Sequence, residues 1–82
     1  MSYEKVKQAK EIIIGTKQTI KALKNGTISE LLLANDTDQH IIDKIVEVAS
    51  ECNVPITRVD SMKKLGAACG IDVGAAVVAV VR

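Results

Sequence analysis

Three lysines near the start of the chain are spaced so that one side of a helix would carry all of them. Lys17, Lys21 and Lys24 stand at positions i, i+4 and i+7. Lys17 would lie in the first helical turn, where a cation opposes the helix dipole. A phosphate bound at the first-turn N–H groups would relieve that conflict. An ordinary amphipathic helix explains the same spacing, so the pattern leaves both interpretations open.

A second candidate is the loop that contains Ile71 and Val73, which Gly70 and Gly74 bound. Apolar side chains exposed on such a loop would gain by touching a partner. The alternative is that they tuck into the protein's own core. The Gly66-x-x-x-Gly70 spacing just before the loop predicts close packing of the last helix on a sheet.

Few side chains could support catalysis. The chain has one histidine, and most of its carboxylates fall in one predicted exposed helix, whereas acid–base chemistry needs polar groups held together. The string Ser61-Met-Lys-Lys64 matches the S-x-x-K motif of acylating serine enzymes, but those enzymes also need SDN and KTG strings and a deep cleft. We therefore expect Ser61 to cap a helix and expect no enzyme. A small hydrolase built on Ser61 is the least favoured alternative.

Metal binding, export and membrane insertion are not expected. Cys52 and Cys69 form no CxxC pair and have no neighbouring histidine, so they should be reduced small hydrophobes in a cytoplasmic protein without a metal or cofactor. The N-terminal residues MSYEKVKQAK lack the apolar core of a signal peptide. The apolar run 65–81 carries Asp72 near its middle and three glycines, which argues against a transmembrane span.

Charge is segregated along the 82 residues although the net charge is only +1. Residues 1–25 hold six lysines and two glutamates, residues 26–60 have a balance of −5, and residues 61–82 return to +2. If the two basic ends meet, the molecule has a positive and a negative face; otherwise both are simply solvated surfaces. Tyr3 is the only aromatic residue, so RRM-type and OB-type readers that stack bases are excluded.

Helical and strand patterns alternate without a linker or repeat, which predicts one domain over residues 1–82. Thr16 would cap a helix that stops at Gly26, and Asp36 or Thr37 would cap the next helix, with Val46 among the inward-facing residues. The continuously apolar strands favour a sheet covered on both faces. The predicted helices are 3–9, 16–25, 37–52 and 62–69; the predicted strands are 11–15 (a strand or a helix end), 31–34, 56–59 and 75–81.

Four stretches occur in an order and spacing that resemble one known family over nearly the whole chain. They are Gly15-Thr-Lys-Gln-Thr-Ile-Lys21, Leu31 to Asp36, Asn53-Val-Pro55, and Ser61 through Gly74. Together they resemble the kink-turn RNA-binding ribosomal protein family, which comprises archaeal L-seven-Ae, eukaryotic L-thirty-e and small bacterial relatives of the YbxF type. The resemblance implies an α/β fold, a three-layer α/β/α sandwich with a small mixed four-stranded sheet.

The resemblance also implies a function: gripping a kink-turn, an RNA helix sharply bent at a short bulge followed by tandem sheared G·A pairs. In the family, the helix that begins at the Gly-x-Asn-Glu-x-x-Lys motif enters the widened major groove. By position, Lys17, Gln18 and Lys21 would read the sheared guanines, with Lys and Gln standing where the archaeal motif has Asn and Glu. Gln18 keeps a carbonyl acceptor for a guanine N–H but lacks the charge that strengthens such a bond.

The remaining implied contacts surround that helix. Asp36 would lie beside the bulged nucleotides, the loop 71–73 would pack on those bases, and the basic pair 63–64 would flank the same RNA surface while the acidic third helix faces away. We expect a cytoplasmic monomer that acts on ribosomal or other structured RNA; the alternative is a protein-interaction module of the translation machinery that uses the loop. The implied RNA-contacting set is Gly15, Thr16, Lys17, Gln18, Lys21, Asp36, Lys63, Lys64, Ile71, Asp72 and Val73.

Overall fold

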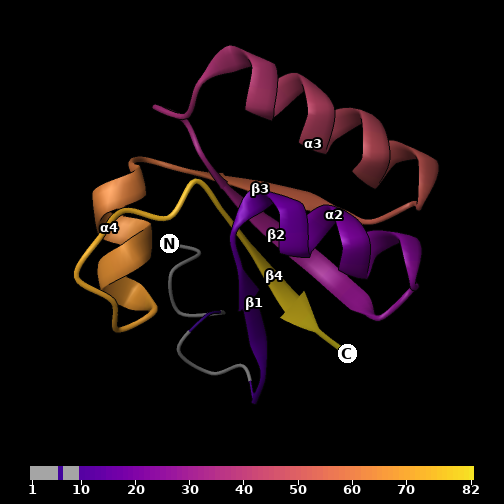
Figure 1. The fold of residues 1–82 in the computed structure, drawn as a ribbon, viewed down its shortest axis with the longest axis horizontal. Coiled ribbons are helices and arrows are strands. Elements are labelled where there is room, and N and C mark those ends of the chain that lie inside the picture. The colour runs from indigo at the N-terminus through magenta and orange to yellow at the C-terminus, as the bar shows by residue number, and fades with distance from the viewer. Residues whose placement is uncertain (1–5, 7–9) are drawn as a thin grey trace.

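A computed structural model describes Val6 and residues 10–82 of the chain (Figure 1). The predicted helix over residues 3–9 lies outside the described part, apart from Val6, whose side chain is buried. The elements in chain order are β1 (Ile12–Ile14), α2 (Thr16–Lys24), β2 (Ile28–Ala34), α3 (Gln39–Glu51), β3 (Ile56–Val59), α4 (Met62–Ala68) and β4 (Val77–Val81).

The four strands form one mixed sheet in the order β1-β4-β2-β3. Strand β4 runs antiparallel to both β1 and β2, and β2 runs parallel to β3. The last strand of the chain therefore lies between the first two. Leu31 on β2 pairs with Ala79 on one side and with Ile56 on the other.

Helices cover both faces of the sheet, so the predicted three-layer sandwich is confirmed. Alternate residues of β2 point to opposite faces: Leu31 and Leu33 pack with buried residues of α2 and α3, and Leu32 packs with Leu65 of α4 and with Val6. Figure 1 shows α2 and α3 close together on one side and α4 set apart from them. Because both faces are buried, β2 is apolar from Leu31 to Ala34 rather than alternating.

Strands β2 and β4 begin at other residues than predicted. Strand β2 begins at Ile28, three residues earlier than expected, because Ile28 pairs with Val81 across an irregularity in the ladder. Strand β4 begins at Val77 rather than at Ala75. The backbone N–H of Ala75 donates to the carbonyl of Met62 instead of to a neighbouring strand.

The helix starts also correct two predictions. Thr16 does not cap α2; Gly15 occupies the cap position, without a side-chain hydrogen bond. Neither Asp36 nor Thr37 caps α3, because Asp38 does so by accepting a hydrogen bond from the N–H of His40. Val46, expected on the inner face of α3, is 43% exposed. The predicted strand 56–59 is confirmed, as is the cap of α4 by Ser61.

Candidate nucleic-acid interface

The candidate residues gather at one end of the sheet. Because β4 runs antiparallel to β1 and β2, and β2 parallel to β3, the ends of β1, β2 and β3 lie beside the start of β4. Gly15, Asp36 and Ser61 follow the first three strands closely, and the loop 70–74 leads towards the fourth. Positions far apart in the sequence therefore meet at this edge.

Backbone hydrogen bonds fix the segments to one another at this edge. The N–H of Gly15 donates to the carbonyl of Val77 at 3.3 Å, and the N–H of Ala34 donates to the carbonyl of Ala76 at 2.9 Å. The start of α2 and the end of β2 are thus both tied to the segment that leads into β4. This edge is a preformed surface, which lowers the ordering cost of binding a partner.

Asp36 joins two of these segments through its side chain. Its Oδ1 accepts a hydrogen bond from the backbone N–H of Met62 at 2.8 Å, which ties the turn after β2 to the start of α4. The buried hydroxyl of Thr37 donates to the carbonyl of Ala76 at 3.4 Å. These bonds explain why neither side chain is available to cap α3. Contact between Asp36 and bulged nucleotides stays a prediction.

The start of α2 depends on the glycine at its cap position. Gly15 has φ +110°, a backbone conformation that favours glycine, and a Cβ there would lie 2.8 Å from Oε1 of Gln18. The amide of Gln18 therefore folds back against the cap. The first turn holds no acidic residue and no side-chain cap, so its N–H donors are suited to an incoming anion.

The lysines of α2 lie on its solvent side, as the spacing predicted. Lys17, Lys21 and Lys24 are all exposed. The buried side differs in detail from the prediction: Leu23 is buried as expected, but Ile20 is only partly buried. Because Lys21 and Lys24 lie in the last turn of a nine-residue helix, they also favour the helix dipole there.

The loop between α4 and β4 is held against α4 by its backbone. The N–H of Ile71 donates to the carbonyl of Gly66 at 3.1 Å. A Cβ on Gly66 would collide with the carbonyl oxygen of Val73 and would lie 3.2 Å from Cα of Gly74. Gly66 therefore permits close packing of α4 on this loop, and the expectation that it serves packing on the sheet is wrong.

The two apolar residues of this loop have different surroundings. Val73 is 70% exposed, as expected for a residue that could meet a partner. Ile71 is only half-buried and packs against the core cluster around Leu32 and Leu65. The core alternative therefore holds in part for Ile71, and contact of its exposed part with a partner stays a prediction. Asp72 between them is exposed.

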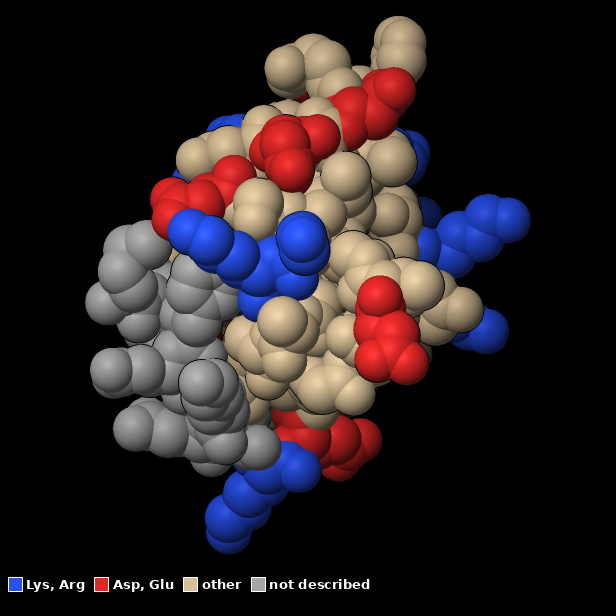
Figure 2. Space-filling model, turned by 90° about the vertical axis from the view of Figure 1, so that its left-hand side faces the viewer, with Lys and Arg blue, Asp and Glu red and all other residues tan. Residues whose placement is uncertain are grey.

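On the side of the molecule that bears α4, the charged side chains of the described residues do not form one continuous basic face. The acidic helix α3 packs beside the basic helix α2 on the same face of the sheet, and an orientation of its carboxylates away from RNA stays a prediction. Figure 2 looks at the side that bears α4, where basic side chains form separate groups with acidic and uncharged surface between them. Lys63 and Lys64 are exposed, and Nζ of Lys64 lies 3.6 Å from the Asp60 carboxylate.

The residues considered for other chemistry have structural partners. The hydroxyl oxygen of Ser61 accepts the N–H of Lys64 at 3.1 Å, which is the capping role expected for it. Burial raises the pKa of the Cys69 thiol, which lowers its thiolate fraction. Within residues 10–82 and Val6, no group of three potential metal-ligating side chains is found. In the same part of the chain no helix is long and apolar enough to cross a membrane.

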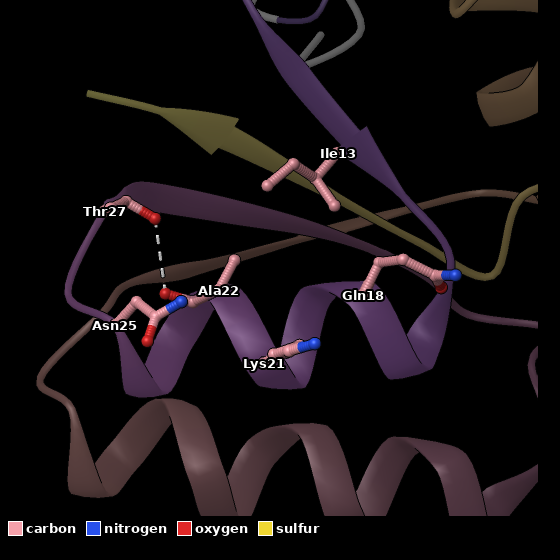
Figure 3. A pocket seen from close by; sticks show the side chains of 6 residues that line it. All are labelled: Ile13, Gln18, Lys21, Ala22, Asn25 and Thr27. Atoms are coloured by element: carbon pink, nitrogen blue, oxygen red, sulfur yellow. Dashed lines mark hydrogen bonds between the residues drawn. The ribbon is translucent and has the colours of Figure 1, made fainter.

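A groove beside α2 was not anticipated from the sequence. It has a volume of about 370 Å³ and opens between β1, α2 and the turn before β2 (Figure 3). Gln18 and Lys21 belong both to this groove and to the predicted RNA-contacting set. No spacing rule could indicate it, because its walls come from a strand, a helix and a turn. Its lining residues are Ile13, Gln18, Lys21, Ala22, Asn25 and Thr27.

Comparison with known proteins places the chain in a family. The family model described as "Ribosomal protein L7Ae/L30e/S12e/Gadd45 family" matches residues 2–82. The chain is 62% identical to "RNA-binding protein YbxF" of Geobacillus stearothermophilus and 63% identical to "RNA-binding protein" of Geobacillus thermodenitrificans, over 82 residues and the full length of each protein. The solved "Giardia lamblia 15.5kD RNA binding protein" superposes with a TM-score of 0.87 at 24% identity, covering 98% of this chain and 70% of that one, which shows the shared fold. The chain therefore belongs to the ribosomal protein L7Ae/L30e/S12e/Gadd45 family.

Proposed function

We propose that this protein binds structured RNA that contains a kink-turn and stabilises its bent form. The observation that carries the proposal is the convergence, at one end of the sheet, of the α2 start, the Asp36 turn and the loop 70–74. Backbone hydrogen bonds and the bond from the Met62 N–H to the Asp36 carboxylate hold these segments together. The family membership and the names of the Geobacillus relatives support RNA as the class of partner.

The chemistry of the edge suits a bent RNA better than a straight duplex. Lys17 and the uncapped first turn of α2 offer positive charge and N–H donors for phosphates. Gln18 offers an amide that can pair with a base edge. Val73 offers an exposed apolar contact for bases that a bend leaves unstacked. A straight A-form helix keeps its major-groove base edges in a deep, narrow groove and offers no unstacked base.

A binding titration tests the proposal. The protein is titrated at physiological salt with a kink-turn RNA, with a straight duplex of equal length, and with the same kink-turn whose sheared G·A pairs are replaced by Watson–Crick pairs. We expect clearly tighter binding to the intact kink-turn than to either control RNA. Equal affinities for all three would refute kink-turn recognition and would favour the alternative, a protein-interaction module.

A matched pair of lysine variants locates the interface. Lys17→Ala removes a cation from the first turn of α2, whereas Lys44→Ala removes an exposed cation from α3. Both variants lower the net charge by the same amount, so binding that depended on net charge alone would weaken equally in the two. We expect Lys17→Ala to weaken kink-turn binding substantially more than Lys44→Ala does.

A further inference from the structure

The groove between β1 and α2 has a size that limits what it can hold. Gln18 and Asn25 line its two ends (Figure 3), and seven residues of helix span about 10 Å. A docked helix would find room along the groove for only about two of its turns, which have a pitch of about 5.4 Å. Strand β1 has only three residues, so an added peptide strand would gain few ladder hydrogen bonds there. A flat object the size of one nucleotide fits better.

The lining suits a nucleotide. Ile13 and Ala22 supply an apolar wall, and the amides of Gln18 and Asn25 supply donors and acceptors for base edges. The hydroxyl of Thr27 already donates to the carbonyl of Ala22 at 3.3 Å, so it is not needed by a ligand.

The charge of the groove and its position point to RNA as the source of that nucleotide. Among the residues that the structure describes, Lys21 is the only charged one in the lining, and none of them places a carboxylate there. Lys17 and Lys24 lie on the neighbouring turns of the same helix and are exposed. Through Gln18 the groove continues directly into the predicted RNA interface at the start of α2.

We propose that this groove takes one unpaired nucleotide of the bound RNA, with its base against Ile13 and Ala22 and its phosphate near Lys21. The proposal rests on the proposed function, because it assumes that α2 approaches RNA. It extends the interface from the first turn of α2 to its C-terminal end. The nucleotide in this groove is distinct from any that meets the loop 71–73, since that loop lies against α4.

Methyl NMR tests the proposal on the unaltered protein. Ile12 and Ile13 are neighbours on β1 but pack towards opposite sides of the sheet, so Ile12 is an internal control. On addition of a kink-turn RNA, we expect a ring-current shift of the Ile13 and Ala22 methyl signals and little change at Ile12. The same RNA is then prepared with each unpaired nucleotide in turn made abasic. At one position the Ile13 shift should vanish and affinity should fall about fivefold.

A variant pair gives a second readout. Asn25→Asp places a carboxylate at the end of the groove, and Asn53→Asp makes the same change at an exposed position after α3. We expect Asn25→Asp to weaken binding of the intact RNA. It should not weaken binding of the RNA that is abasic at the position where the Ile13 shift vanishes. Asn53→Asp should change neither affinity.

The outcomes separate this inference from the proposed function. If the kink-turn RNA is not preferred over a duplex, the proposed function fails and the groove proposal fails with it. If the kink-turn RNA binds selectively but the Ile13 methyl signals do not move and the two asparagine variants behave alike, only the groove proposal is overturned. If the Ile13 signals move with protein concentration in the absence of RNA, a second copy of the chain fills the groove and the proposal is likewise overturned.

Discussion

Replacing Gly66 by alanine is expected to move the loop 70–74 while leaving the fold in place. Gly66 is buried in α4, and an added Cβ would collide with the carbonyl oxygen of Val73 and lie 3.2 Å from Cα of Gly74. Both are backbone atoms, so a change of rotamer cannot relieve the collision. The loop 70–74 must therefore shift away from α4.

Two opposing terms set the cost for stability. Alanine is favoured over glycine within a helix by about 1 kcal/mol, whereas overpacking of a tight contact costs about 1–3 kcal/mol. We therefore expect the free energy of unfolding to fall by about 0–2 kcal/mol. The cost for binding is separate: burying the side chain of Val73, which is 70% exposed, contributes about 1 kcal/mol. Losing that contact weakens RNA binding about fivefold.

The assay combines urea denaturation of the free protein with a kink-turn RNA titration at several salt concentrations. Because the lysines of α2 are not displaced, the salt dependence of Gly66→Ala should match that of the unaltered protein. Ala67→Gly is the matched control: Ala67 is exposed on the same helix, so this change costs about 1 kcal/mol of stability without touching the loop. Wild-type affinity in Gly66→Ala, or an equal loss in Ala67→Gly, would refute the reasoning.

Three further predictions concern single side chains. Val73→Ala should weaken kink-turn binding about fivefold and leave the denaturation midpoint unchanged. Ile71→Ala should lower the free energy of unfolding by about 1–2 kcal/mol, because Ile71 packs on the core. A large drop in the midpoint for Val73→Ala would contradict this. In salt titrations, Lys21→Ala should reduce the slope of log affinity against log salt by about 0.9. Gln18→Ala should cost about 1–3 kcal/mol of binding free energy without changing that slope. A slope change in Gln18→Ala and none in Lys21→Ala would contradict both roles. Within the described part of the chain, the buried hydroxyl of Thr19 has no hydrogen-bond partner, so Thr19→Val should preserve or raise the thermal midpoint. A marked decrease would show that the hydroxyl is satisfied in solution.

The sequence alone determined the kinds of element and the exposure of the lysines on α2. Apolar runs bounded by glycine, proline and capping residues located the strands and helices, because those signals act over a few neighbouring residues. The cap at Ser61 is of this kind, since its hydroxyl meets an N–H three residues away. The exposed stripe from Lys17 to Lys24 is also local, because helical geometry alone fixes its spacing.

The choice among adjacent polar residues needed the tertiary structure. Thr16, Asp36 and Thr37 all have side chains that commonly cap helices, yet none of them caps its helix. Gly15 occupies the cap position of α2, so Thr16 already lies inside the helix. The Asp36 carboxylate accepts a hydrogen bond from the start of α4, and the Thr37 hydroxyl donates to the segment just before β4. Those contacts join residues more than 25 positions apart, so no local pattern reports them.

The two candidate binding features were likewise completed only by the fold. Ile71 and Val73 look equivalent in the sequence, but the packing of the loop against Gly66 leaves one of them partly in the core and the other 70% exposed. The groove beside α2 exists only because Ile13 of an edge strand lies across from Lys21 and Asn25 of a helix. Side chains from separate elements meet through long-range packing, and that packing is decided by how the whole sheet is covered rather than by the residues on either side of each position.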